Sequence, residues 1–290
     1  MSTNRHKIAF TVDVEDWYQG IELPISSWPK YEKRIEIGLN IILNLLNEHQ
    51  AKATFFILGW VAEKYPALVK QIYNEGHEIG SHGYSHTKVY QLNPTTFKEE
   101  ISRTKKTIED ITGTEVLAYR APFFSITENS QWALPILAET GHEIDASLTA
   151  VKTWRYGVEN CPAHIFQFKN SGLIEFPVSS FSFIVKKWAI GGAYFRLFPY
   201  WFSHSKISKH LAKNEYAMFY IHPWEYDVQH PKIKLKSKLG AFTHYVKLKN
   251  TFEYTNLLLS NFNCTTMQDI LENERKKYEI IVLDEQHIFS

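Results

Sequence analysis

Two histidines in one short segment are the first residues of this chain that could bind a metal ion. His82 and His86 lie in the segment SHGYSH at residues 81–86, so one helical turn or tight loop could bring both imidazoles to the same ion. Neutral imidazole suits zinc, and a carboxylate can supply a third ligand. Because an isolated pair with this spacing more often forms only hydrogen bonds, the metal hypothesis depends on what else lies nearby.

An acidic run near the start of the chain is the candidate source of that carboxylate. Asp13, Glu15 and Asp16 follow the apolar segment KIAFTV at residues 7–12. Side chains alternate along a strand with a period of two, so Asp13 and Glu15 should point the same way if the strand persists. One carboxylate could then take a proton while another binds metal. The alternative is a solvated acidic turn.

Further polar residues follow other apolar segments. Arg120 follows VLAY, Asp145 follows HEI, and His222 follows MFYI. If these segments are parallel strands of a barrel, their carboxyl ends meet at the face where barrel active sites are built. A buried Arg120 beside Asp13 would keep that acid ionised and oriented, whereas an exposed one would be an ordinary surface cation.

The elements that would position these residues alternate between strand and helix. Apolar, β-rich runs predict strands at residues 7–12, 53–59, 77–81, 116–119, 143–146, 173–179 and 216–221. Amphipathic periodicity predicts helices near residues 35–46, 61–75, 94–112, 129–140 and, as the last one, 252–261. Asn93 as N-cap, Pro94 at the first helical position and Gly113 at the end delimit the third helix. This alternation implies a parallel sheet.

Two junctions of the chain look alike. The segments NEGHEIG at residues 74–80 and ETGHEID at residues 139–145 each read as a helix end, a glycine cap and a strand. Such a weak repeat is expected if βα units recur around a barrel. Residues 150–215 alternate less regularly, and we expect strands and substrate loops there, not a second domain.

Composition narrows the class of protein. The chain has 290 residues, of which 44% are hydrophobic and 22% charged, as in ordinary globular proteins with a substantial core. A net charge of +1 provides no global field for nucleic acid. Cys161 and Cys264 are too few for a disulfide framework. We find no signal-peptide h-region and no bilayer-length apolar run, and we therefore expect a cytoplasmic protein.

Five segments together resemble a known family. TVDVED, SHGYSH, YRAPFF, DASL and YIHPWE occur in this order between about residues 8 and 225. The set resembles the carbohydrate esterase family 4 polysaccharide deacetylases. With the alternation above, the resemblance leads us to expect a single α/β domain, a distorted (β/α) barrel of about seven parallel strands. Residues 226–290 would be a C-terminal extension packed on the barrel.

The resemblance implies a role for each polar residue at the strand ends. Asp13 would be the general base, Arg120 its orienting partner and His222 the general acid. Independently of the resemblance, we expect Asp145 to be a nearby carboxylate that raises the pKa of His222. His82 and His86 would bind one divalent metal ion, expected to be Zn²⁺, with Co²⁺ or another metal as alternatives. Because Val14 separates Asp13 from Glu15, the third ligand is either Glu15, which we favour, or Asp16.

The resemblance also implies which residues contact the substrate. The backbone N–H of Phe123 would face the oxyanion, with Pro122 and Phe124 beside it and Ile221 as an apolar wall for the acetyl methyl. Residues 175–270 more loosely resemble a subgroup associated with bacterial exopolysaccharide and surface-glycan gene sets. That likeness suggests a sugar contact for three residues that could otherwise simply pack loops: Tyr194, Arg196 and Trp224.

The expected function is therefore metal-dependent hydrolysis of N-acetyl groups from an N-acetylhexosamine-containing glycan or glycan precursor. Two alternatives remain open at this point. The same site could hydrolyse the C–N bond of a small non-sugar amide, because a fold does not fix its substrate. A non-catalytic glycan-binding protein is the other alternative, and the presence of Asp13 and His222 argues against it.

Overall fold

One curled sheet organises the molecule. The computed structural model describes residues 7–153, 155–184, 186–235 and 237–290. Along the sheet the strands run β10-β1-β2-β3-β4-β5-β7-β6-β12, and β11 pairs with the start of β1 on the edge opposite β10. Their bounds are β1 Lys7–Val14, β2 Thr54–Ile57, β3 Glu78–Ser81, β4 Ala118–Tyr119, β5 Ile144–Asp145, β6 Phe166–Phe168, β7 Ile174–Glu175, β10 Tyr216–Ile221, β11 Asn263–Thr265 and β12 Ile281–Leu283.

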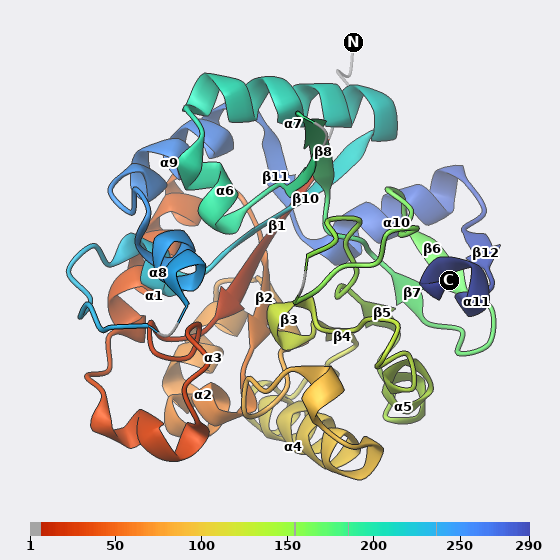
Figure 1. Ribbon diagram of the computed structural model, residues 1–290, viewed down its shortest axis with the longest axis horizontal. Helices are drawn as coiled ribbons and strands as arrows, with labels where there is room; N and C mark the ends of the chain where they lie inside the picture. Colours follow the sequence, from red (N-terminus) through yellow and green to blue (C-terminus); the bar gives the residue numbers. More distant parts are fainter. Residues whose placement is uncertain (1–6, 154, 185, 236) are drawn as a thin grey trace.

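The predicted parallel α/β architecture is confirmed. From β10 through β1, β2, β3, β4 and β5 to β7, every pair of neighbours is parallel, which gives the expected seven strands. Beyond β7 the sheet continues antiparallel into β6. Helices surround the curved sheet, which forms a half-barrel and not a closed cylinder (Figure 1). The polar residues that follow these strands therefore meet at one edge.

Most predicted helices are present. The structure contains α1 Ile35–Glu48, α2 Gly59–Lys64, α3 Pro66–Asn74, α4 Pro94–Thr112, α5 Ala133–Glu139, α6 Gly192–Leu197, α7 Tyr200–Asn214, α8 Lys238–Tyr245, α9 Asn250–Asn261, α10 Met267–Lys277 and α11 Glu285–Phe289. Asn93 caps α4 by accepting a hydrogen bond from the Thr96 N–H, and Gly113 ends it at φ 74°. The helix predicted near 61–75 is divided, because Pro66 cannot donate to the preceding turn.

The two similar junctions have the same structure. Gly76 and Gly141 adopt φ values of 76° and 77°, the left-handed conformation that a glycine cap supplies. β3 begins two residues after Gly76, and β5 begins three residues after Gly141. His77 and His142, which follow the glycines, are both buried. The likeness of the two segments therefore reflects the same helix-to-strand connection.

The second half of the chain departs from the sequence expectation. Residues 150–215 contain α6, α7 and a β-hairpin, β8 Ser180–Phe183 with β9 Lys186–Ala189. The buried face of α7 includes Ser203 and His210, which obscure its apolar period. The predicted last helix, α9, is followed by further elements, and β11 and β12 join the main sheet. Residues 226–290 thus contribute strands as well as packing helices.

Alternation along β1 sets the layers of the core. Ile8, Phe10 and Val12 pack outward into a cluster with the surrounding helices, whereas Ala9 faces an inner cluster with Phe56 and Met218. Asp13 has the parity of Ala9 and therefore projects to the inner side at the carboxyl end of the strand. Within the described ranges, every helix falls short of the length and apolarity needed to cross a bilayer.

Candidate active site

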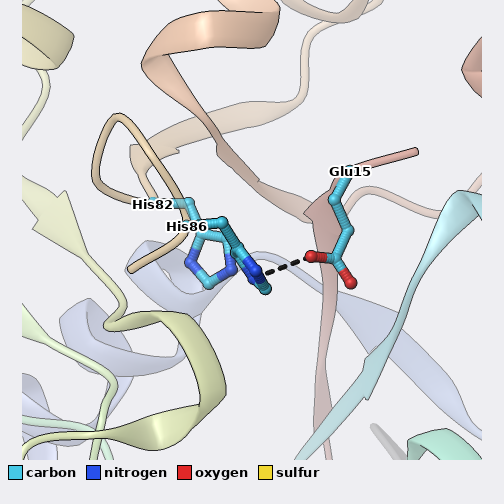
Figure 2. Close-up of side chains that lie close together, drawn as sticks. All are labelled: Glu15, His82 and His86. Atoms are coloured by element: carbon cyan, nitrogen blue, oxygen red, sulfur yellow. Dashed lines mark ion pairs between the residues drawn. The ribbon is translucent and has the colours of Figure 1, made fainter. Parts of the chain in front are cut away.

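Glu15, His82 and His86 form a compact group of potential metal ligands. One donor atom from each side chain lies within 4.8 Å of the other two, and all three residues are buried. His86 Nε2 is 2.7 Å from Glu15 Oε2, and the His82 ring lies beside that pair (Figure 2). Glu15 directly follows β1, His82 directly follows β3, and His86 lies in the loop after β3 with φ 54°.

Neighbouring groups orient these donors. His82 donates from Nδ1 to the Arg120 carbonyl oxygen at 2.8 Å, which leaves Nε2 free to act as a ligand atom. Trp224 donates from its indole N–H to Glu15 Oε1 at 3.0 Å. Ligating histidines and carboxylates are commonly held by such outer hydrogen bonds. Burial lowers the pKa of His82 to about 4, which keeps the imidazole in the neutral form that binds metal.

The donor set fits a divalent metal such as zinc. Two imidazoles and one carboxylate match the protein ligands of catalytic zinc sites, which keep a further position open. Burial alone would raise the pKa of Glu15, but the neighbouring His86 and His222 imidazoles together hold that pKa well below its usual range. Glu15 is therefore anionic, as a metal ligand must be.

Asp16, the alternative third ligand, faces another part of the molecule. Its carboxylate accepts hydrogen bonds from the backbone N–H groups of Trp17, Arg34 and Ile35 at the start of α1. Burial raises the pKa of Asp16 to about 6. The structure thus brings Glu15 to the two histidines and leaves Asp16 as a brace between β1 and α1.

Asp13 and Arg120 form a buried pair beside the ligand group. Arg120 donates from one terminal nitrogen to Asp13 Oδ1 at 2.7 Å and to Thr11 Oγ1 at 2.8 Å. Its Nε donates to the Ala146 carbonyl, and the guanidinium lies 4.2 Å from the centre of the Phe56 ring. Arg120 is fully buried, so its placement matches the inward orientation expected of it and not that of a surface cation.

His222 lies across from these residues at the end of β10. Its Nε2 is 3.6 Å from Glu15 Oε1 and 3.8 Å from Asp13 Oδ2. Its Nδ1 donates to Glu225 Oε1 at 2.6 Å. Burial lowers the pKa of His222, but the Glu15 and Glu225 carboxylates outweigh burial and raise it to about 9. Asp13, Glu15 and His222 therefore form one polar cluster.

Asp145, expected to be the carboxylate partner of His222, contacts Ser147 and Glu175 instead. Its carboxylate accepts a hydrogen bond from Ser147 and lies against Glu175, on the neighbouring strand β7. Burial raises the pKa of Asp145 to about 6 and that of Glu175 well above its usual value, so the two carboxyls can share a proton. Glu225 stands where Asp145 was expected.

Arg196 and Glu225 are residues whose place the sequence did not reveal. Arg196 was expected near the sugar, yet it is fully buried and pairs through Nε with Glu225 Oε2 at 2.6 Å. Arg196 is thus part of the support behind His222 and does not face a substrate. The sequence could have revealed the pairing of His222 with Glu225 through their spacing, since side chains three residues apart meet on one helical turn.

The other expected substrate contacts divide into buried and accessible residues. Phe123 packs its ring 4.5 Å from that of His86 and adopts φ 55°, a strained conformation that tends to occur at functional sites. Tyr194 is half-buried and lies near the Tyr156 hydroxyl. The remaining residues are buried and have little surface to offer a substrate: Pro122, Phe124, Ile221 and Trp224.

Two family models match the chain in succession. The model described as polysaccharide deacetylase matches residues 38–144. A second model, described as a domain of unknown function (DUF3473), matches residues 146–272. The first segment carries His82, His86 and Arg120, and the second carries His222 and Glu225. The cluster of polar side chains is therefore assembled from both matched segments together with residues at the end of β1.

Curated relatives match part of the chain. A peptidoglycan-N-acetylglucosamine deacetylase of Bacillus cereus is 42% identical over 93 residues, which cover 32% of this chain and 34% of the relative. A peptidoglycan deacetylase of Helicobacter pylori is 30% identical over 113 residues, 39% of this chain and 38% of the relative. The matched stretches thus span only about a third of each relative.

Solved structures share the fold over nearly the whole chain. A Mycobacterium smegmatis protein assigned as a polysaccharide deacetylase superposes with a TM-score of 0.66 at 18% identity, covering 98% of this chain and 95% of the other. The allantoinase PuuE superposes with a TM-score of 0.60 at 14% identity, covering 96% and 93%. The family match therefore shows that the chain carries a polysaccharide deacetylase domain over residues 38–144.

Proposed function

We propose that this protein is a metal-dependent deacetylase that hydrolyses N-acetyl groups on N-acetylhexosamine units of a glycan or glycan precursor. One observation carries the proposal. A compact group of one carboxylate and two imidazoles lies beside a buried acid with its arginine and a histidine on the opposite side. That arrangement supplies the ligands, base and acid that hydrolysis of an unactivated amide needs.

In this proposal, three residues bind the metal ion and a fourth is the general base. Glu15, His82 and His86 would hold the metal ion, proposed to be Zn²⁺, which as a Lewis acid polarises the acetyl carbonyl and lowers the pKa of water. Asp13, oriented by its hydrogen bond from Arg120, takes the proton from the attacking water.

The remaining residues act on the oxygen and nitrogen of the amide. The backbone N–H of Phe123 would stabilise the oxyanion. His222 then protonates the departing amine through Nε2, the ring nitrogen that faces Asp13 and Glu15. The amine needs this proton because an amide nitrogen leaves poorly without one.

A second candidate is hydrolysis of a small non-sugar amide. The fold similarity to an allantoinase supports keeping it, because that protein shares the architecture over most of both chains. Similarity of fold alone does not determine whether the substrate is a glycan or a small cyclic amide.

Acetate release separates these functions. The chain is treated with a chelator, reloaded with Zn²⁺ or Co²⁺, and assayed on N-acetylglucosamine oligomers, other acetylated glycans and small cyclic amides. We expect acetate only from the acetylated sugars and only after metal is returned. Hydrolysis confined to small amides would support the second candidate, and glycan binding without any hydrolysis would contradict both.

A further inference from the structure

The imidazole of His222 is held by a carboxylate on the same turn. His222 is the N-cap of the 3-10 turn Pro223–Tyr226. Glu225 Oε1 accepts the His222 backbone N–H at 3.0 Å and its ring Nδ1–H at 2.6 Å. A carboxylate can only accept, so Nδ1 must carry a proton. Nε2 is then the ring atom that exchanges a proton on the side of Asp13 and Glu15.

A buried arginine fixes the other oxygen of Glu225. Arg196 Nε lies 2.6 Å from Glu225 Oε2, and both side chains are about 1% exposed. The terminal nitrogens of Arg196 donate to the carbonyl oxygens of Thr243, His244 and Val246. The guanidinium therefore joins α6 to the end of α8 and has its hydrogen bonds directed into protein. It anchors Glu225 in one orientation.

Ring stacking restrains the same turn from the side. The His222 ring stacks on Trp224 at 5.2 Å between centroids, and Trp224 stacks on His244 at 4.1 Å. Trp224 also donates to Glu15 Oε1. One short turn thus fixes both the histidine and a ligand of the proposed metal site. All of these residues except Glu15 lie in the segment 146–272, the match to a domain of unknown function.

We propose that Glu225, anchored by Arg196, is the positioning residue for His222, in the role expected of Asp145. The proposal rests on the proposed function for its chemistry, but not for its geometry. The segment 146–272 would then supply the proton donor His222 together with the two residues that orient it, Glu225 and Arg196. A purely structural buried ion pair is the competing explanation, because such pairs often contribute little beyond local packing.

Turnover on two substrate types distinguishes these explanations. In the metal-loaded 290-residue chain, Glu225→Gln should lose roughly 10²-fold or more on an acetylated sugar amide. It should lose much less on an activated acetate ester, whose leaving group needs little protonation. His222→Gln should show the same pattern. Glu253→Gln, at an exposed position of α9, serves as the matched control and should behave as the parent.

Combining variants tests the anchor. If Arg196 acts through Glu225, Arg196→Gln with Glu225→Gln should cost about as much as Glu225→Gln alone, since the effects of coupled residues do not add. Arg196→Lys, which keeps the positive charge, should lose less turnover than Arg196→Gln. Equal losses on amide and ester, or a lowered melting temperature with normal turnover per folded molecule, would overturn the positioning role.

A spectroscopic measurement does not depend on catalysis. In protein with ¹⁵N-labelled histidine, the His222 resonances are assigned by their disappearance in His222→Gln. The parent should show a strongly hydrogen-bonded Nδ1–H, which Glu225→Gln should weaken or abolish and Asp145→Asn should leave in place. An unchanged signal in Glu225→Gln would refute the proposal. Should the parent release no acetate, the proposed function fails while this spectrum still decides the positioning.

Discussion

Asp13 is the residue whose chemistry and surroundings are most sharply defined. Arg120 holds one carboxylate oxygen at 2.7 Å, and the other faces His222 Nε2 at 3.8 Å. An asparagine has nearly the same shape and could still accept the hydrogen bond from Arg120. Its amide, however, cannot take a proton from water. Position 13 therefore allows the proton-accepting role to be removed with little change in packing.

We expect Asp13→Asn to bind metal like the parent and to lose about 10²–10⁴-fold in turnover, the usual worth of general base catalysis. Metal content by elemental analysis and acetate release by a coupled assay measure the two properties on one preparation. Near-normal acetate release with full metal content would remove Asp13 from the role of base.

The sequence located most strand-end residues and the pairing of Arg120 with Asp13, but not the carboxylate that pairs with His222. Each of four residues follows a predicted strand, a pattern that can be recognised in the sequence alone: Asp13, His82, Arg120 and His222. The choice between Glu15 and Asp16 depends on where β1 stops and on the start of α1, which Asp16 caps. The choice of Glu225 over Asp145 as the partner of His222 likewise depended on the 3-10 turn that follows β10.

At the scale of elements, α1 and the turn that carries His222 are packed unusually closely. A Cβ placed on Gly38 would stand 1.8 Å from the Pro223 carbonyl oxygen. No side chain fits there without displacing one of the two backbones. In an exposed helix, glycine to alanine would instead gain about 1 kcal/mol from helix propensity.

We therefore predict that Gly38→Ala lowers both stability and turnover, because overpacking typically costs about 1–3 kcal/mol and here it displaces the His222 turn. Asn40→Ala, at an exposed position of the same helix, is the control and should stay within about 0.5 kcal/mol of the parent. Urea unfolding and acetate release provide the comparison. If Gly38→Ala matched the control in both, the close packing would have no functional consequence.

The sequence predicts a helix or strand well where the spacing of apolar residues is regular or where capping residues mark its ends. The helix α4 has an N-cap, a proline at its first position and a glycine end, and its bounds agree with expectation. β11, only three residues long, has too little sequence to reveal a strand, and its pairing with β1 spans most of the chain. Short strands of this kind are defined by the sheet they join.

The whole molecule contains two buried histidines at its equivalent helix-to-strand junctions. Burial lowers the pKa of His77 to about 4 and that of His142 to about 3. In the unfolded chain both should titrate near pH 6.5. Between about pH 6.5 and 4 the unfolded state therefore binds more protons than the folded state. Stability is complete above pH 6.5 and falls as the pH is lowered.

Each histidine should cost about 2 kcal/mol of unfolding free energy at pH 5 relative to neutral pH. The double variant His77→Gln with His142→Gln should consequently lose less stability between pH 7.5 and pH 5 than the parent. Urea unfolding across that range measures the difference. The exposed His287 provides a matched His287→Gln control with the parent's acid sensitivity. An equal decline in the double variant would show that other groups cause the acid sensitivity.

The account's central claim is that Glu15, His82 and His86 hold the metal on which deacetylation depends. The most direct measurement is acetate release from N-acetylglucosamine oligomers as Zn²⁺ is titrated into chelator-treated protein. We predict that release rises with added metal and saturates at one ion per chain, and that His82→Ala shows no rise at the same concentrations. Release that is full without metal, or unchanged in His82→Ala, would contradict the account.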